Sequence, residues 1–189
     1  MYIVAITGCK GSGKSFFAEQ LKRQLTIHTA HEAFIIPLAS TLKGIIAYLS
    51  CWDMATLEDP VLKETAFNIA HGPTLNPRKA MQAVGNFFRE LFGPDVWVRA
   101  LEKKIPPNAT VVIVPDMRFE NEYAFFKNPV FRLVHVHIHN VEAEAKVDGV
   151  DLDVSELGWK TFGAKADVTV LNFIGKDLSK VLEHTQSYL

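Results

Sequence analysis

The sequence predicts an α/β fold in which helices flank a doubly wound, mostly parallel sheet. Short apolar runs typical of strands alternate along the chain with segments whose apolar residues recur at helical spacing. The run at 110–114 (TVVIV) is continuously β-branched, which is typical of a parallel strand buried on both faces. We expect one domain over 1–189, because 189 residues with 48% hydrophobic content are enough for one core.

The first 49 residues are predicted to form two strand–helix pairs. Each strand is a short apolar run, and each helix repeats apolar residues at helical spacing. The strands are expected at 2–6 and 34–38, and the helices at 16–25 and 42–49.

The middle of the chain is predicted to be helical apart from one irregular stretch. Residues 51–77 have little periodicity, which suggests an insert around one short helix at 61–69. Pro77 opens a longer helix, since proline is favoured in a first turn. The apolar stripe of this helix is expected to face the core. The stripe consists of Met81, Val84, Phe88 and Leu91, and a further helix is expected at 95–104.

The last third of the chain is predicted to complete the sheet and to supply a flexible lid. Strands are expected at 110–114, 131–138 and 168–172, and helices at 118–127 and 176–184. Residues 140–165 are rich in Asp, Glu, Lys and Gly, which favours a lid that excludes water from a site. The alternative is a solvated connection.

Three histidines alternate at the end of the strand predicted at 131–138. His135, His137 and His139 project from one face if the strand persists to its last residue. Transition-metal ligands usually converge from several elements, and we find no Cys or carboxylate placed to complete this set. We therefore expect no metal at these histidines.

Residues 8–15 (GCKGSGKS) match the pattern G-x-x-x-x-G-K-[ST] between a predicted strand and a predicted helix, which indicates a P-loop. Its glycines allow backbone conformations and close approaches that a Cβ would block, so N–H groups can surround a phosphate at the positive end of the helix. Lys14 is expected to reach the β- and γ-phosphates and Ser15 to bind Mg²⁺. The alternative is a glycine-rich turn in which the lysine occurs by chance and binds no phosphate. The residues expected to bind ATP are Gly8, Gly11, Ser12, Gly13, Lys14 and Ser15.

An acidic residue follows the predicted strand at 110–114. P-loop enzymes often place a carboxylate associated with Mg²⁺ at such a position, so Asp116 is a second candidate ligand for the ion. Asp116 and Arg118 are expected to face the same crevice as Lys14, because open α/β sheets bind ligands at the carboxyl ends of their strands. The alternative for Asp116 is the N-cap of the helix at 118–127.

Composition excludes several classes of function. The net charge of −1 argues against a nucleic-acid partner. Two cysteines, Cys9 and Cys51, form no disulfide framework or metal-binding spacing. No apolar stretch is long enough to span a bilayer, and no signal peptide opens the chain. We expect a cytoplasmic protein with no membrane partner.

Four segments, taken together and in order, resemble the deoxynucleoside monophosphate kinases of tailed bacteriophages. They are 8–15, 77–85 (PRKAMQAVG), 95–98 (DVWV) and 114–122 (VPDMRFENE). The resemblance implies a nucleoside-monophosphate-kinase-like fold and transfer of the ATP γ-phosphate to a deoxynucleoside 5′-monophosphate, which gives the diphosphate. It also implies a possible homodimer and, for a phage-encoded chain, the host cytoplasm.

The resemblance also implies residue roles. Lys10 and Lys14 would hold phosphates, and Arg118 would bind the phosphate of the monophosphate. The remaining candidates for the acceptor pocket are Arg78 for phosphate and Gln82, Trp97 and Glu122 for the base and sugar, although Trp97 suits a core position nearly as well. The chain departs from the family at Asp153, where relatives often have His, and at Ile138 and His139, where they often have Arg.

Two other functions remain open. A different small-molecule P-loop kinase, similar to dephospho-coenzyme A kinase, has a comparable organisation. A non-catalytic nucleotide-binding protein is disfavoured, because it need not keep Lys14, Ser15 and Asp116 together. The absence of an N-K-x-D motif lowers the GTPase option.

Overall fold

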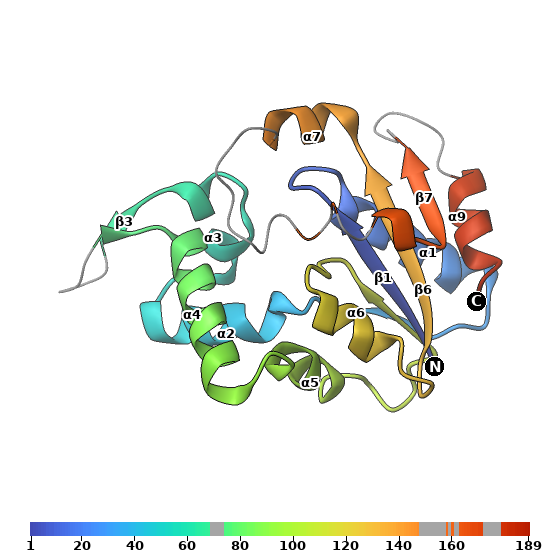
Figure 1. The fold of residues 1–189 in the computed structure, drawn as a ribbon, viewed down its shortest axis with the longest axis horizontal. Helices are drawn as coiled ribbons and strands as arrows, with labels where there is room; N and C mark the ends of the chain where they lie inside the picture. The colour runs from blue at the N-terminus through green and yellow to red at the C-terminus, as the bar shows by residue number, and fades with distance from the viewer. Residues whose placement is uncertain (69–73, 148–157, 159, 161–162, 172–178) are drawn as a thin grey trace. The chain divides into compact units, whose positions relative to one another are not determined.

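The computed structural model spans residues 1–189 and describes all of them except 69–73, 148–157, 159, 161–162 and 172–178 (Figure 1). The described residues form two compact units. The sheet unit comprises Met1–Pro37 and Lys104–Leu189, and the helical unit comprises Leu38–Lys103. The insert expected at 51–77 lies within the helical unit, which extends beyond both ends of that range.

The sheet unit contains a five-stranded sheet with the strand order β2-β5-β1-β6-β7, in which every neighbouring pair is parallel. The strands are β1 (Tyr2–Gly8), β2 (Ala33–Ile35), β5 (Val111–Val114), β6 (Arg132–His139) and β7 (Val168–Leu171). The predicted α/β fold with a parallel sheet is therefore confirmed. Because β1 is the central strand, the loop that follows it leaves from the middle of the sheet's carboxyl edge.

Helices flank this sheet, as the alternating pattern predicts. Figure 1 shows α6 in front of the sheet and α1 behind it. The helices are α1 (Lys14–His28), α6 (Glu120–Phe126), α7 (Val141–Val147) and α9 (Ser179–Gln186), with a short 3₁₀ turn η2 (Gly163–Lys165). The expected helix at 176–184 begins outside the described residues, and α9 is described from Ser179.

The core of the sheet unit lies on both sides of β1 and β5. All four residues of β5 are fully buried, which confirms the buried strand expected at 110–114. In α1, Phe17, Ala18, Leu21 and Leu25 are buried at helical spacing and belong to the same apolar cluster as the strands. This stripe aligns α1 with the sheet and so places the start of the helix beyond the end of β1.

The helical unit contains four α-helices, one 3₁₀ turn and one small hairpin within its described residues. They are α2 (Ala39–Ser50), α3 (Met54–Glu58), η1 (Leu62–Glu64), β3 (Phe67–Asn68), β4 (Thr74–Leu75), α4 (Pro77–Phe92) and α5 (Val96–Glu102). The helix predicted at 61–69 is wrong. The chain turns extended at Thr65, and Phe67 pairs with Leu75 in an antiparallel ladder that the local sequence pattern does not reveal.

The packing face of α4 differs from the predicted apolar stripe. Its buried residues are Pro77, Ala80 and Gly85, whereas Leu91 at the end of the predicted stripe is 59% exposed. A Cβ on Gly85 would lie 3.4 Å from Leu42 of α2, so the small residues of α4 allow a close approach of the two helices. The stripe expected to face the core is therefore wrong at Leu91, whereas Phe88 does pack against the buried Trp97, with ring centroids 5.8 Å apart.

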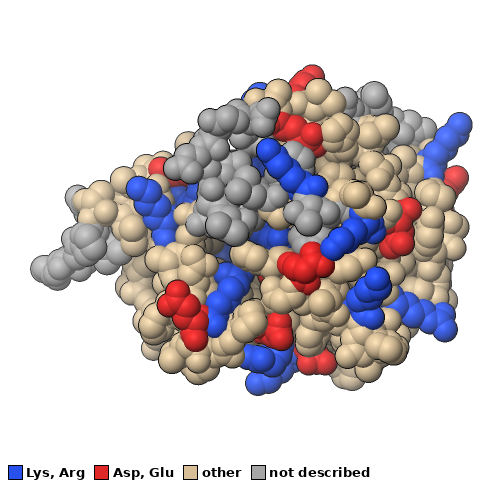
Figure 2. All heavy atoms as spheres, in the orientation of Figure 1, with Lys and Arg blue, Asp and Glu red and all other residues tan. Residues whose placement is uncertain are grey.

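The described surface is mixed in charge. Figure 2 shows Lys and Arg side chains interspersed with Asp and Glu over the face that it draws. Among the described helices, none combines the length and the apolar character needed to cross a membrane.

Candidate functional site

The loop between β1 and α1 takes a backbone course that only its glycines allow. Gly8, Gly11 and Gly13 have φ values of 147°, 78° and 95°. Side chains larger than hydrogen rarely tolerate such values. Gly13 is the residue that caps α1, and the helix has no acidic residue in its first turn. The positive end of α1 therefore opens from this loop without a neutralising carboxylate.

Gly8 is also constrained by a close neighbour. In the parallel register it pairs with Ile138 of β6. A Cβ on Gly8 would lie 2.5 Å from the carbonyl oxygen of Ile138 and 2.7 Å from the Ser12 hydroxyl. Glycine at this position is thus required by both conformation and space, and the loop is packed directly against the end of β6.

The lysine of the loop folds back onto the loop itself. Lys14 Nζ donates hydrogen bonds to the carbonyl oxygens of Gly8, at 2.8 Å, and Cys9, at 2.6 Å. The hydroxyl of Ser12 is fully buried and makes no hydrogen bond within the described part of the chain. A buried hydroxyl without a partner costs free energy, so Ser12 is suited to bond a ligand that enters the loop.

Lys10 and Ser15 lie at the surface of the same segment, where both side chains are exposed. Ser15 is the second residue of α1, directly after Lys14. The six residues expected to bind ATP therefore lie together, in one short loop and the first turn of α1. Backbone N–H groups, an ammonium group and the positive helix end are features that suit a phosphate ligand.

Asp116 follows β5, the strand next to β1. The two strands run parallel, and Ala5 pairs with Val114, so Asp116 comes off the same edge of the sheet as the glycine loop. The alternative role of Asp116 as a helix cap is wrong. Helix α6 begins at Glu120 and is capped by Phe119, because the chain continues for three residues beyond Asp116 before it turns helical.

Glu122 holds the turn that contains Arg118. Its Oε2 accepts hydrogen bonds from the backbone N–H groups of Arg118, at 2.7 Å, and Phe119, at 3.0 Å. The Glu122 residue is only 3% exposed. A buried carboxylate with two backbone donors stabilises the local backbone strongly, so Glu122 positions Arg118 by holding its main chain.

The other acceptor-pocket candidates belong to the helical unit. Arg78 Nε donates to a carboxylate oxygen of Glu64, and Gln82, one helical turn later, is half-buried. Trp97 is 4% exposed, and its indole N–H donates to the carbonyl oxygen of Gly85 at 3.3 Å. The environment of Trp97 in this unit is that of a core tryptophan, which was the alternative to a stacking role.

A buried hydrogen-bond network joins β1 to β6 beside the glycine loop. Thr7 Oγ1 lies 2.8 Å from His135 Nε2 and 2.9 Å from His137 Nδ1. Thr7 and His135 are fully buried, and His137 is 5% exposed. Burial lowers the pKa of His137 to about 4, with a further contribution from His135, and burial also lowers the pKa of His135. Both rings are therefore neutral at pH 7.

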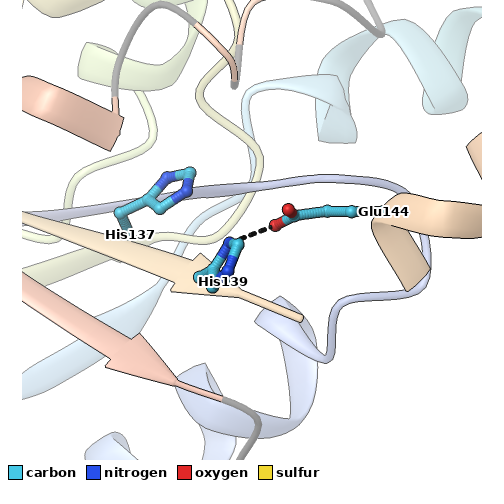
Figure 3. Close-up of side chains that lie close together, drawn as sticks. All are labelled: His137, His139 and Glu144. Carbon is cyan, nitrogen blue, oxygen red and sulfur yellow. Dashed lines mark ion pairs between the residues drawn. The ribbon is translucent and has the colours of Figure 1, made fainter. Parts of the chain in front are cut away.

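A carboxylate completes the histidine set, contrary to our expectation from the sequence. Glu144 of α7 lies 2.7 Å from His139 Nδ1 through its Oε1 (Figure 3). The side chains of His137, His139 and Glu144 offer ligand atoms that all lie within 4.8 Å of one another. Sequence analysis missed Glu144, although Asn140 is a favoured N-cap residue that predicts a helix start four residues earlier.

The predicted lid is described only in part. Helix α7 and the turn η2 occupy its two ends, and Lys165 of η2 pairs with Glu120 at 2.8 Å. The departure from the phage family at Asp153 lies outside the described residues.

No family model matches this chain, and no curated protein matches it.

Proposed function

We propose that this chain is a P-loop kinase that transfers the γ-phosphate of ATP to a deoxynucleoside 5′-monophosphate. The glycine loop is the single observation that supports phosphate binding most strongly. Three positive φ values precede α1, and Lys14 is held beside the loop by two backbone carbonyls. The acceptor assignment is supported by the segments 77–85, 95–98 and 114–122, which resemble the phage deoxynucleoside monophosphate kinases.

The loop residues would hold ATP through its phosphates. The Lys14 ammonium leaves the carbonyls of Gly8 and Cys9 and reaches the β- and γ-phosphates, whose negative charge attracts it more strongly. Lys10 adds a second positive charge from the exposed side of the loop. The buried hydroxyl of Ser12 gains a phosphate oxygen as its partner.

Ser15 and Asp116 are suited to hold Mg²⁺. Both offer oxygen atoms, which this ion prefers, and Asp116 comes off the sheet edge beside the loop. When bound, Mg²⁺ would neutralise charge on the β- and γ-phosphate oxygens.

The acceptor would be positioned by arginines. Arg118 binds the phosphate of the monophosphate and is kept in place by the Glu122 carboxylate under its main chain. The resemblance makes Arg78 a second candidate ligand for phosphate and Gln82 a candidate for the base and sugar. The proposal includes the lid expected at 140–165 and the possible homodimer that the resemblance implies.

A coupled assay with ATP and Mg²⁺ against a panel of ribo- and deoxynucleoside monophosphates tests this function. We expect turnover of one or more deoxynucleotides by the wild type. Because Lys14 neutralises charge in the transition state, Lys14→Ala should lower kcat/KM at least about a hundredfold. Lys180→Ala, an exposed lysine of α9, is the matched control and should leave turnover unchanged.

The outcomes separate the two halves of the function. If kcat/KM is equal for the wild type and Lys14→Ala, the loop does not act in phosphoryl transfer. If no nucleotide is phosphorylated while ATP still binds, the acceptor assignment is wrong and the assay extends to coenzyme A precursors. If a folded Lys14→Ala protein binds ATP as the wild type does, the loop does not bind ATP through Lys14.

A further inference from the structure

Two imidazoles and a carboxylate gather at the carboxyl end of β6. His137 and His139 come from the strand, and Glu144 comes from α7, which follows it (Figure 3). Their ligand atoms lie within 4.8 Å of one another. The side chain of His139 is 38% exposed and that of Glu144 is 17% exposed, so a small solute can reach the group from one side.

The hydrogen bonds of His137 determine which of its nitrogens faces a ligand. Its Nδ1 is engaged with Thr7 Oγ1 at 2.9 Å. The Thr7 hydroxyl has one proton and also contacts His135 Nε2, so one of the two rings must donate to it.

A ligand role for His137 requires His137 to be the ring that donates to Thr7. His135 Nε2 then accepts the Thr7 proton, and His137 donates from Nδ1. His137 Nε2 consequently carries the lone pair that a metal requires. A histidine ligand whose second nitrogen donates to a neighbouring oxygen is the usual arrangement in metal sites.

Glu144 is held in place independently of the histidines. Its Oε1 accepts a hydrogen bond from the backbone N–H of Asn140 at 3.3 Å, in addition to its contact with His139. The Asn140 side chain in turn caps α7 by accepting from the Ala143 N–H at 3.0 Å. The start of α7 therefore fixes the carboxylate opposite the end of β6.

A single ion requires only small side-chain movements. Metal–ligand bonds of about 2.0–2.2 Å place neighbouring ligand atoms about 3–3.5 Å apart. The contact between His139 and Glu144 must open slightly from 2.7 Å, and the widest separation must close from its limit of 4.8 Å. His139 is partly exposed and has room for such a rotation.

We propose that His137, His139 and Glu144 form a Zn²⁺ site with one coordination position open to water. Two imidazoles with one carboxylate suit Zn²⁺, whereas Mg²⁺ and Ca²⁺ prefer oxygen ligands alone. The site is distinct from the oxygen ligands Ser15 and Asp116. It adjoins the glycine loop, because Ile138, between the two histidines, pairs with Gly8.

Metal titration of the full-length protein, first freed of metal with a chelator, tests this site without nucleotide. Zn²⁺ is added in competition with a chromophoric chelator, so that the stoichiometry and Kd are both measured. We expect one tightly bound Zn²⁺ that excess Mg²⁺ does not displace. His139→Ala and Glu144→Gln should each raise the Kd about tenfold or more, as loss of one ligand does.

His28→Ala is the matched control, because His28 is an exposed histidine at the end of α1. It should bind Zn²⁺ as the wild type does. Co²⁺ provides a second readout, since its visible absorption intensifies when imidazoles replace water, and this signal should be lost in His139→Ala. Circular dichroism verifies that each variant is folded.

The outcome that overturns the site is equally specific. If the wild type binds no Zn²⁺, or if folded His139→Ala and Glu144→Gln both bind it as tightly as the His28→Ala control, the three side chains form only an ion pair beside a buried histidine.

Discussion

Gly8 and Ile138 approach so closely across β1 and β6 that a Cβ on Gly8 would lie 2.5 Å from the Ile138 carbonyl oxygen. We therefore expect Gly8→Ala to lower the free energy of unfolding by about 1–3 kcal/mol, because overpacking against backbone forces the strands to shift. Urea denaturation measures the effect.

Gly44→Ala is the matched control. Gly44 lies inside α2, and a Cβ there meets no atom within 4 Å. Alanine is favoured over glycine in a helix interior by about 0.5–1 kcal/mol, so this variant should be more stable than the wild type. Equal stability of Gly8→Ala and the wild type would contradict the close packing at Gly8.

Thr7→Val should destabilise the protein through the two buried histidines. Valine has the shape of threonine but cannot bond His135 or His137. Each ring nitrogen left without its partner costs about 1–3 kcal/mol. Thermal or urea unfolding measures the loss. The control Thr26→Val, at an exposed position of α1, should change stability by less than about 0.5 kcal/mol. A similar loss of stability in both variants would show that the hydrogen bonds of Thr7 to the two histidines do not stabilise the protein.

Stability should fall on mild acidification in metal-free buffer. The pKa of His137 is lowered from 6.5 to about 4 in the folded protein, so the unfolded chain binds more protons between these values. The free energy of unfolding is therefore highest above pH 6.5 and declines as the pH falls towards 4. Urea unfolding at several pH values measures the slope.

Carboxylates also titrate in this pH range, so a variant is needed to assign the pH dependence of stability to His137. His137→Gln removes the titrating ring and should make the pH dependence shallower. The control His184→Gln, at an exposed position of α9, should keep the slope of the wild type. If His137→Gln is as pH-sensitive as the wild type, His137 is not the titrating group.

Glu122→Ala should test whether Glu122 positions Arg118 for binding of the monophosphate. The substitution leaves the N–H groups of Arg118 and Phe119 without their acceptor, at a cost of about 1–3 kcal/mol. If Arg118 binds the monophosphate, the KM for that substrate should rise while ATP affinity is retained. Glu120→Gln, which weakens an exposed pair with Lys165, is the control for both measurements. An unchanged monophosphate KM in folded Glu122→Ala would argue against the positioning role.

Much of the fold could be predicted because it depends on local pattern. The apolar runs at 2–6 and 110–114 became neighbouring buried strands, and the helix opened by Pro77 begins at that residue. The glycine loop was predictable for the same reason, since the order of strand, glycines and helix lies within one short segment. The helix predicted at 61–69 failed because pairing between Phe67 and Leu75 overrides local propensity.

The site beside the loop was decided by the tertiary structure. Thr7 and His137 are 130 positions apart, and they meet only because β1 and β6 pair in parallel register. Glu144 reaches His139 because β6 ends there and Asn140 starts a helix that returns the chain towards the strand. The sequence alone determined the alternating strands and helices and the glycine-rich course of the loop, since both follow from neighbouring residues. Strand order and register, which no local pattern encodes, decided which side chains surround that loop.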